Sequence, residues 1–377
     1  MKRILPILIL FSSWVVVSCK STGTIETQVW GHSDHGVDGD KNVWMKAPPA
    51  GEGLQIAVQP FIVPGDSVEV QGNFYFHLPT SVPFDVGVIE IAMNEGTHHM
   101  NMYKSTVKWP ADSGIPRPIV FTHLDGKVDT QNVRYQAEFN ATIVRNGGDM
   151  MVEAQVPYLN WTFPKLPTGE QTSVHFGAND TVIIENHYVN VPNLNGGGSQ
   201  LTPNGKGKII INLWKAQAAS TVHASMMFAR KTTSLIIPKY SDTVAQKSCY
   251  FSPTTLRAAP IYMLGMTGHY HSRGKNFWVE KRRAIHDGAG ALISDSLIAT
   301  IYRSPSWDEP PFAVFDPPIQ LNLAAGDYIK YYAEYVNNTG NVIKFGPHVA
   351  VEEHMNLFTW FAPGWNDGQT LYDDVSN

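Results

Sequence analysis

Cysteine is almost absent from this chain, which contains only Cys19 and Cys249 in 377 residues. Because Cys19 falls in a predicted N-terminal processing signal, Cys249 is the one thiol left to pair in the mature chain. One thiol cannot form an internal disulfide, so the fold must depend on its hydrophobic core. Cys249 lies in a strand-like run, where we expect a buried structural thiol.

Charged residues and helical periodicity are also scarce. Charged residues make up 16% of the chain and the net charge is −5, with no basic stripe, so nucleic acid is not an expected partner. Few segments have apolar residues at helical spacing over three turns, whereas 31 glycines and 25 prolines mark frequent turns. We therefore expect an all-β protein that is long enough for two domains of ordinary size.

The N-terminus resembles a bacterial lipoprotein signal. A charged start precedes the apolar run Ile4–Val17, and the tetrapeptide ending in Cys19 resembles a lipobox. We expect residues 1–19 to be a signal peptide that is cleaved before Cys19, followed by lipidation of this cysteine; an ordinary signal peptide that happens to contain a cysteine is the alternative. Residues 20–52 are interpreted as a tether and irregular N-terminal segment. The predicted location is extracytoplasmic, with a lipid anchor in a bacterial membrane, facing the periplasm or the cell surface.

Two parts of the chain, residues 53–217 and 218–377, repeat the same order of segments. In each part an apolar run leads to a histidine pair, over residues 86–99 in the first part and 260–271 in the second. Two later segments also correspond between the two parts. One is a strand-like run that follows an aspartate, and the other is a final apolar run. Short apolar or alternating runs between Gly, Pro and Asn turns are typical of antiparallel sandwiches, so we predict two tandem jelly-roll-like β-sandwich domains with these bounds.

Histidines and one methionine lie at corresponding places in the two parts. His269 and His271 are two residues apart at an expected strand end, so both can face one ion. His98 and His99 are adjacent, so they can reach one ion only at a strand end or a bulge, which the preceding Asn94-Glu95-Gly96 allows. The sequence therefore predicts two metal sites, one formed by His98, His99 and His187 and the other by His269, His271 and Met355.

The predicted ligands favour copper. Three imidazoles suit Cu(II), Zn(II) or Fe(II), whereas two imidazoles with a thioether favour copper because the soft sulfur of Met355 stabilises Cu(I). Two related sites that differ in their third ligand therefore indicate copper and a redox role.

The other histidines are interpreted as ordinary polar residues. His354 adjoins Met355, but neighbours on a strand alternate between faces, so His354 is expected either to support the site from behind its ligands or to face solvent. The segment containing His32 and His35 is interpreted as a solvated loop, with a metal site as the alternative. We assign no ligand role to His77, His123, His175, His223, His286 or His348.

Six short motifs occur in an order that points to a known family. They are His98-His99-Met100, His187-Tyr188, His269-Tyr270-His271 followed by Gly274-Lys275, Gly326-Asp327, Tyr335-Val336-Asn337-Asn338-Thr339, and Glu353-His354-Met355 after Phe345-Gly346. With these motifs the segment Gly53–Phe361 resembles the copper type II, ascorbate-dependent monooxygenases, the family of peptidylglycine α-hydroxylating monooxygenase and dopamine β-monooxygenase.

The resemblance implies two jelly-roll-like β-sandwich domains that face each other across a solvent-filled cleft. It also implies that the first ligand set, His98, His99 and His187, holds an electron-transfer copper. The second set, His269, His271 and Met355, would hold the copper at which O₂ binds and a substrate C–H bond is hydroxylated. The two copper ions of each chain would be reduced by ascorbate or another one-electron donor, and the substrate would be a small molecule or a peptide.

The chain departs from the peptide-hydroxylating members of that family. Thr267 stands where those members have an arginine that binds the substrate carboxylate, and Leu357 and Thr359 stand where they have asparagine and tyrosine. The substrate is therefore left open. The alternatives are a copper-binding or copper-buffering lipoprotein without hydroxylase activity, and an adhesive or carbohydrate-binding sandwich with incidental histidines. Ligand sets in both halves favour the enzyme.

Overall fold

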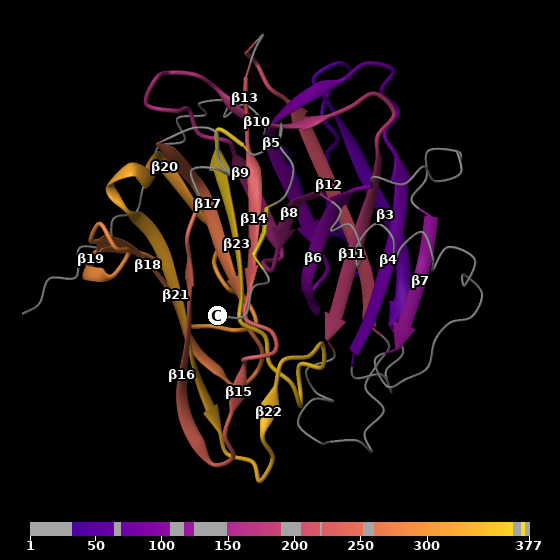
Figure 1. The fold of residues 1–377 in the computed structure, drawn as a ribbon. Helices are drawn as coiled ribbons and strands as arrows, with labels where there is room; N and C mark the ends of the chain where they lie inside the picture. The colour runs from indigo at the N-terminus through magenta and orange to yellow at the C-terminus, as the bar shows by residue number, and fades with distance from the viewer. Residues whose placement is uncertain are drawn as a thin grey trace, which may run out of the picture.

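The computed structural model describes residues 32–63, 69–105, 117–123, 149–189, 205–218, 221–251, 260–364 and 371–373. These residues form mainly strands, connected by turns and irregular segments (Figure 1). The expectation of an all-β chain built from antiparallel β-sandwiches is confirmed. The predicted signal peptide, with Cys19, lies outside the described residues. Within the described ranges, no helix is long and apolar enough to cross a membrane.

The strands divide between the two halves of the chain. The first half contributes β1 (His35–Val37), β2 (Val43–Met45), β3 (Gly53–Val63), β4 (Glu69–His77), β5 (Phe84–Met93), β6 (Thr97–Lys104), β7 (Arg117–His123), β8 (Asp149–Ala154), β9 (Tyr158–Thr162), β10 (Thr172–Phe176), β11 (Thr181–Val189) and β12 (Gly205–Lys215). The second half contributes β13 (Val222–His223), β14 (Ser225–Arg230), β15 (Ile236–Ile237), β16 (Ser241–Cys249), β17 (Ile261–His269), β18 (Gly274–His286), β19 (Leu292–Ser304), β20 (Ala313–Leu321), the short 3-10 helix η3 (Leu323–Ala325), β21 (Asp327–Asn337), β22 (Ile343–Lys344), β23 (Asn356–Ala362) and β24 (Leu371–Asp373).

Two sheets pack against each other in the first half. One has the strand order β13-β10-β5-β12-β3, with β9 also paired to β5, and its edge strand β13 comes from the second half. The other has the order β7-β4-β11-β6-β8. Ile91 and Ile211 of the first sheet and Met102 and Ile183 of the second are fully buried in one shared core. The apolar runs of β5, β12 and β11 therefore supply the inner faces of a sandwich.

The second half repeats this arrangement. One sheet has the order β20-β17-β23-β14-β24 and the other β16-β21-β18-β19. On β21, Ile329, Tyr331, Ala333 and Tyr335 are fully buried and alternate with half-buried residues, as a strand with one face on the core requires. The central strands correspond between the halves, because β3-β12-β5 and β4-β11-β6 match β14-β23-β17 and β16-β21-β18. The repeat in the sequence is thus also a repeat in strand order.

The two halves lie side by side and share part of a core (Figure 1). Trp360 of β23 packs on Trp161 of β9 with ring centroids 4.8 Å apart, and its Nε1 donates a hydrogen bond to the Met151 carbonyl of β8 at 3.0 Å. Gln155, which follows β8, donates through Nε2 to the Gly268 carbonyl of β17 at 2.8 Å. These contacts form a buried boundary between the halves.

Glu153 of β8 is fully buried, and neither of its carboxyl oxygens has a hydrogen-bond partner. Burial raises the pKa of Glu153 well above the ordinary value of 4.5, so the folded protein keeps the group neutral. A raised folded pKa lowers stability as the pH rises above 4.5, because only the unfolded chain then releases the proton. We expect Glu153→Gln to match the wild type at lower pH and to become more stable than it above that value, by about 1.4 kcal/mol per pH unit until the folded pKa is reached.

Urea unfolding at a series of pH values measures this difference. The exposed Glu52 provides the control, since Glu52→Gln should follow the wild-type pH dependence. If the unfolding free energies of Glu153→Gln and the wild type differed by the same amount at every pH, Glu153 would not be held neutral in the folded protein.

Candidate metal centre

Six histidines from both halves meet at the boundary between the halves. They are His98 and His99 at the start of β6, His187 on β11, His269 at the end of β17, His271 in the turn that follows, and His354 just before β23. We call this set the histidine cluster. The ring centroids of His98 and His269 lie 4.9 Å apart, and those of His271 and His354 lie 4.2 Å apart. The resemblance implies a solvent-filled cleft between two sites, whereas here imidazoles of the two halves contact each other because the halves dock directly.

A bulge lets two adjacent histidines face the cluster. On β11, His187 pairs with His99 and Tyr188 pairs with Thr97 of β6, so His98 is the extra residue of the bulge. His98 and His99 are therefore released from the alternation of a regular strand, and their ring centroids lie 5.3 Å apart. This is the irregularity that two ligands at adjacent positions require.

Hydrogen bonds fix one ring nitrogen each of His269 and His271 in the second half. His269 Nδ1 donates to Oε1 of Gln155 at 2.6 Å, and His271 Nδ1 donates to the carbonyl of Glu352 at 3.1 Å. Each bond sets the tautomer, so the lone pair is on Nε2 and points elsewhere. Metal-binding histidines have this arrangement, because the second nitrogen usually donates to a carboxylate, a carbonyl or water.

Several ring nitrogens of the histidine cluster are buried and have no hydrogen-bond partner. These atoms are His98 Nε2, His99 Nδ1, His269 Nε2, His271 Nε2 and His354 Nδ1. A single buried polar atom without a partner costs about 1–3 kcal/mol, so a protein rarely tolerates several of them side by side. Five such nitrogens in one cluster fit a set of donors for metal ions.

The donors form two groups of three that share one member. The ligand atoms of His98, His99 and His269 lie within 4.8 Å of one another, and so do those of His269, His271 and His354. The predicted division between the halves therefore differs from the observed grouping, in which His269 of the second half is also close to the histidines of the first.

The pKa values of five imidazoles in the histidine cluster are lowered, which favours the neutral form of His98, His99, His269, His271 and His354. Burial, and then the neighbouring imidazoles, lower the pKa of His98 and His269 well below the ordinary value of 6.5. The pKa of His99 is also lowered by burial, although the adjacent Glu185 partly offsets this effect. Neutral imidazoles present lone pairs, which metal binding requires.

His187 is oriented by a carboxylate that also contacts the second half. Its Nε2 donates to Oε2 of Glu69 at 3.0 Å, while Oε1 of Glu69 accepts the backbone N–H of Val349 at 2.8 Å. The His187 ring lies beside that of His99, with centroids 4.9 Å apart. His187 is outside both groups of three, but its bond to Glu69 leaves Nδ1 as the nitrogen that can bind an ion.

His354 lies beside the predicted ligand His271, with ring centroids 4.2 Å apart, so the expectation that it faces solvent is wrong. That expectation assumed strand alternation, but β23 begins only at Asn356, and His354 precedes the regular strand. Its ring stacks on Phe345, and one of its ring nitrogens lies within 4.8 Å of ligand atoms of His269 and His271. Met355 is fully buried and packs in the core of the second half.

The turn that contains His271 is held by a buried carboxylate. Glu353 accepts the backbone N–H groups of His271 and Arg273, each at 2.8 Å. Burial raises the pKa of Glu353 to about 8, even though these two hydrogen bonds act in the opposite direction. Glu353, Gln155 and Glu69 were not singled out from the sequence as site residues. Only the position of Glu353, two residues before the predicted ligand Met355, could have indicated such a role.

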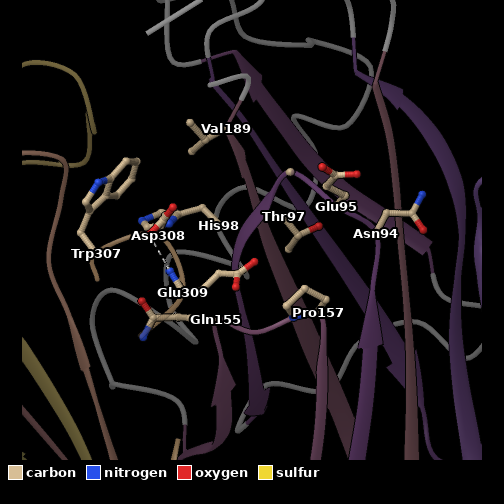
Figure 2. Close-up of a pocket in the computed structure, with 11 residues that line it drawn as sticks. Asn94, Glu95, Thr97, His98, Gln155, Pro157, Val189, Trp307, Asp308 and Glu309 are labelled. Carbon is tan, nitrogen blue, oxygen red and sulfur yellow. Dashed lines mark hydrogen bonds between the residues drawn. The ribbon is translucent and has the colours of Figure 1, made fainter. Parts of the chain in front are cut away.

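A pocket leads to the histidine cluster from the boundary between the halves. It has a volume of about 200 Å³, and His98 lies in its wall. Figure 2 shows Trp307 on one side of His98 and Glu95 with Asn94 on the other, so both halves line the pocket. The Trp307 ring lies 5.7 Å from the His98 ring, measured between centroids. The pocket can therefore bring a small molecule next to the cluster.

Comparison with known proteins adds no assignment. No family model and no curated protein matches the sequence. Among solved structures, the chain is similar to that of Broad Bean Stain Virus, with 9% identity, 87% of this chain and 95% of that chain covered, and a TM-score of 0.25. It is also similar to the tandem CBM22-1-CBM22-2 domain of Paenibacillus barcinonensis Xyn10C, with 6% identity, 88% and 90% covered, and a TM-score of 0.19. At such TM-scores the similarity supports no inference about this chain.

Proposed function

We propose that this protein is a copper-dependent monooxygenase that hydroxylates a C–H bond with O₂ and a one-electron donor such as ascorbate. The observation that carries the proposal is the set of five buried imidazole nitrogens without partners, contributed by both halves. Imidazole suits copper, zinc and iron alike. The order of motifs along the chain, which resembles the copper type II monooxygenases, favours copper among these metals.

The histidine cluster would hold two copper ions. His98 and His99, with His187 as the third ligand, would hold one ion. His269 and His271 would hold the other, with either His354 or Met355 as the third ligand. When bound, copper supplies the one-electron chemistry that couples oxidation of the donor to reduction of O₂ and hydroxylation of the substrate.

Residues of the chain orient the ligands and shield them from bulk water. Gln155 accepts the Nδ1–H of His269, so Nε2 stays directed into the cluster. Both side chains are buried, which keeps bulk water away from this hydrogen bond. A substrate in the pocket beside His98 would contact the Trp307 ring. Because pockets for drug-sized ligands usually have volumes of about 300–1,000 Å³, this smaller pocket favours a small molecule over a peptide.

The proposed enzyme works outside the cytoplasm. Cleavage before Cys19 and lipidation of this residue would anchor the chain to a bacterial membrane by its N-terminus, as the lipobox-like sequence indicates. Metabolic labelling with a fatty-acid analogue tests the anchor, and we expect Cys19→Ser to remove the label while leaving copper binding intact.

The first test is copper stoichiometry in the chain lacking residues 1–19. We expect two copper ions per chain, reduction of both by ascorbate, and O₂ uptake that depends on ascorbate. Two bound copper ions without O₂ uptake, even in the presence of a broad set of small molecules, would favour the copper-buffering lipoprotein. Fewer than two copper ions would contradict the division of the cluster between two sites.

Substitution of Met355 identifies the third ligand of the second copper. Met355 is fully buried, so Met355→Ala is expected to destabilise the fold by about 2–5 kcal/mol through the cavity it leaves. Met355→Leu conserves the volume and should cost less than about 1.5 kcal/mol, so it removes little besides the sulfur. If the thioether binds copper, Met355→Leu will lose ascorbate-dependent turnover and the Cu–S signal in X-ray absorption. Full activity in Met355→Leu, together with loss of activity in His354→Ala, would assign the position to His354.

A further inference from the structure

A second set of metal-binding side chains lies on the outer face of the first sandwich and includes no residue of the histidine cluster. It consists of Asp85 on β5, His175 on β10 and His223 on β13. Phe84 and Phe176, which neighbour Asp85 and His175 along their strands, are buried in the core. Because side chains alternate along a strand, Asp85 and His175 face outward.

The strand register brings these three residues together. Asp85 pairs directly with His175 across β5 and β10. His223 pairs with Ser173 across β10 and β13, and Ser173 lies on the same face as His175, two residues away. The imidazoles of His175 and His223 stack with centroids 4.6 Å apart. His175 on β10 therefore lies between Asp85 on one neighbouring strand and His223 on the other.

Both histidines direct one ring nitrogen at the same carboxylate oxygen. His175 Nδ1 lies 2.7 Å and His223 Nε2 lies 3.1 Å from Oδ1 of Asp85. One ligand atom from each of the three residues lies within 4.8 Å of the other two. Two imidazoles with one carboxylate are a donor set that zinc, iron(II) and related divalent ions bind.

The carboxylate is held in place by hydroxyl groups. Oδ2 of Asp85 accepts a hydrogen bond from Oγ1 of Thr221 at 2.6 Å, and this hydroxyl is in turn 2.7 Å from Oγ of Ser173. Burial acts to raise the pKa of Asp85, but the hydrogen bonds from Thr221 and His175 and the charge of His223 outweigh it and hold this pKa below its ordinary value. A charged and oriented carboxylate of this kind is typical of metal ligands.

We propose that Asp85, His175 and His223 form a binding site for a divalent transition-metal ion of the zinc type, with one coordination position left open. Bonds of about 2.0–2.1 Å in a tetrahedral site place neighbouring donors about 3.3 Å apart. The observed separations of 2.7 and 3.1 Å from Asp85 need to widen only slightly to reach that value. Each imidazole must also move its proton to the other ring nitrogen, so that a lone pair replaces the N–H group that faces Asp85.

The open position faces a cavity. Asp85, His175 and His223 line a cavity of about 390 Å³, together with Lys215 and Ala216. Water or a small anion can complete the coordination from this side, and the ammonium group of Lys215 favours an anion. Three protein ligands with a fourth, exchangeable position distinguish such a site from a closed structural zinc site.

The site also ties together the two halves of the chain. β13 is only two residues long, follows the connection between the halves, and pairs with the edge of the first-half sheet. A metal ion bound by His223 would fasten β13 to β10 and β5. By mass action, an ion that binds only the folded arrangement stabilises it.

Zinc stoichiometry tests the proposal on the full chain. Zn²⁺ binding is measured by competition with a chromogenic chelator in the wild type, His223→Gln and His77→Gln, where His77 is a matched histidine on β4 that is hydrogen-bonded to Thr181. The histidine cluster is the same in all three proteins, so any zinc ions that it binds are counted equally in each. We expect His223→Gln to bind one zinc ion fewer than the wild type and His77→Gln to bind the same number.

An isosteric variant covers the case in which His223→Gln fails to fold. Asp85→Asn keeps the shape of the side chain, and we expect its affinity for the same zinc ion to fall at least tenfold. Unchanged stoichiometry and affinity in a folded His223→Gln or Asp85→Asn protein would overturn the proposal. Copper binding by the histidine cluster is measured separately, so failure of this site and failure of the proposed monooxygenase are distinguishable.

Discussion

Replacement of His269 by alanine is expected to remove the second copper ion and to leave the first. Nδ1–H of His269 donates to Gln155, so Nε2 carries the one available lone pair of the ring and can bind only one ion. Loss of a residue that merely supports a ligand typically weakens metal affinity 10–100-fold, so loss of this ligand should weaken binding of the second ion by at least about 100-fold. The variant should bind one copper ion, counted by competition with a chelator, and its ascorbate-dependent O₂ uptake should fall to background.

Variants of ligands proposed for one ion each provide the comparison. His98→Ala should lose the first copper ion and keep the second, whereas His271→Ala should lose the second and keep the first. His286 at the exposed end of β18 is the matched control, and His286→Ala should retain both ions. A His269→Ala protein that loses both copper ions would contradict the assignment of the first ion to His98, His99 and His187. Unfolding in the presence of a chelator verifies that each variant folds without metal.

The class of the fold was predictable because the strand signals are local. The alternation of buried residues on β21 and the apolar run of β5 are both readable over about ten residues of sequence. The repeat between the halves was also readable, since each half places its histidine pair after an apolar run. Such patterns depend on residues near each other in the chain, which is why they appear without a structure.

Which histidines lie close together was partly predictable, and the failures have a physical cause. The adjacent pair His98-His99 required a bulge, and the structure has one at this position. The orientation of His354 was mistaken because strand alternation was extended to a residue that precedes β23. Gln155, which orients His269, lies 114 residues away from it in the chain, and no local pattern connects the two.

Contacts between distant strands also explain why Asp85, His175 and His223 were not predicted as a set. Each residue alone is an ordinary polar position on the outer face of a strand. The pairing of β5 with β10 and of β10 with β13 makes them neighbours, and this register is not encoded in the sequence near any one of them. Residue sets assembled by strand register therefore need the structure, whereas side chains brought together at one strand end, such as His269 and His271, do not.

Trp360→Ala is expected to destabilise the protein by about 3–5 kcal/mol, because it removes a fully buried ring and leaves a cavity. The ring packs on Trp161 and Phe312, and its N–H is bonded to the Met151 carbonyl, so the cavity would open at the boundary between the halves. Urea unfolding followed by fluorescence and circular dichroism measures the change. Trp360→Phe, which keeps most of the ring volume, should cost about 1–3 kcal/mol by leaving the Met151 carbonyl unpaired.

The same substitution tests whether the histidine cluster depends on the docking of the halves. Gln155 reaches His269 across the boundary that Trp360 holds together, so a loosened boundary should separate this pair. We expect copper affinity in Trp360→Ala to fall 10–100-fold while Trp360→Phe stays near the wild type, since loss of an orienting hydrogen bond has an effect of this size. A Trp360→Ala protein that is less stable but binds copper as tightly as the wild type would show that each half positions its histidines independently. In that case the contact between the imidazoles of the two halves would follow from docking without contributing to metal affinity.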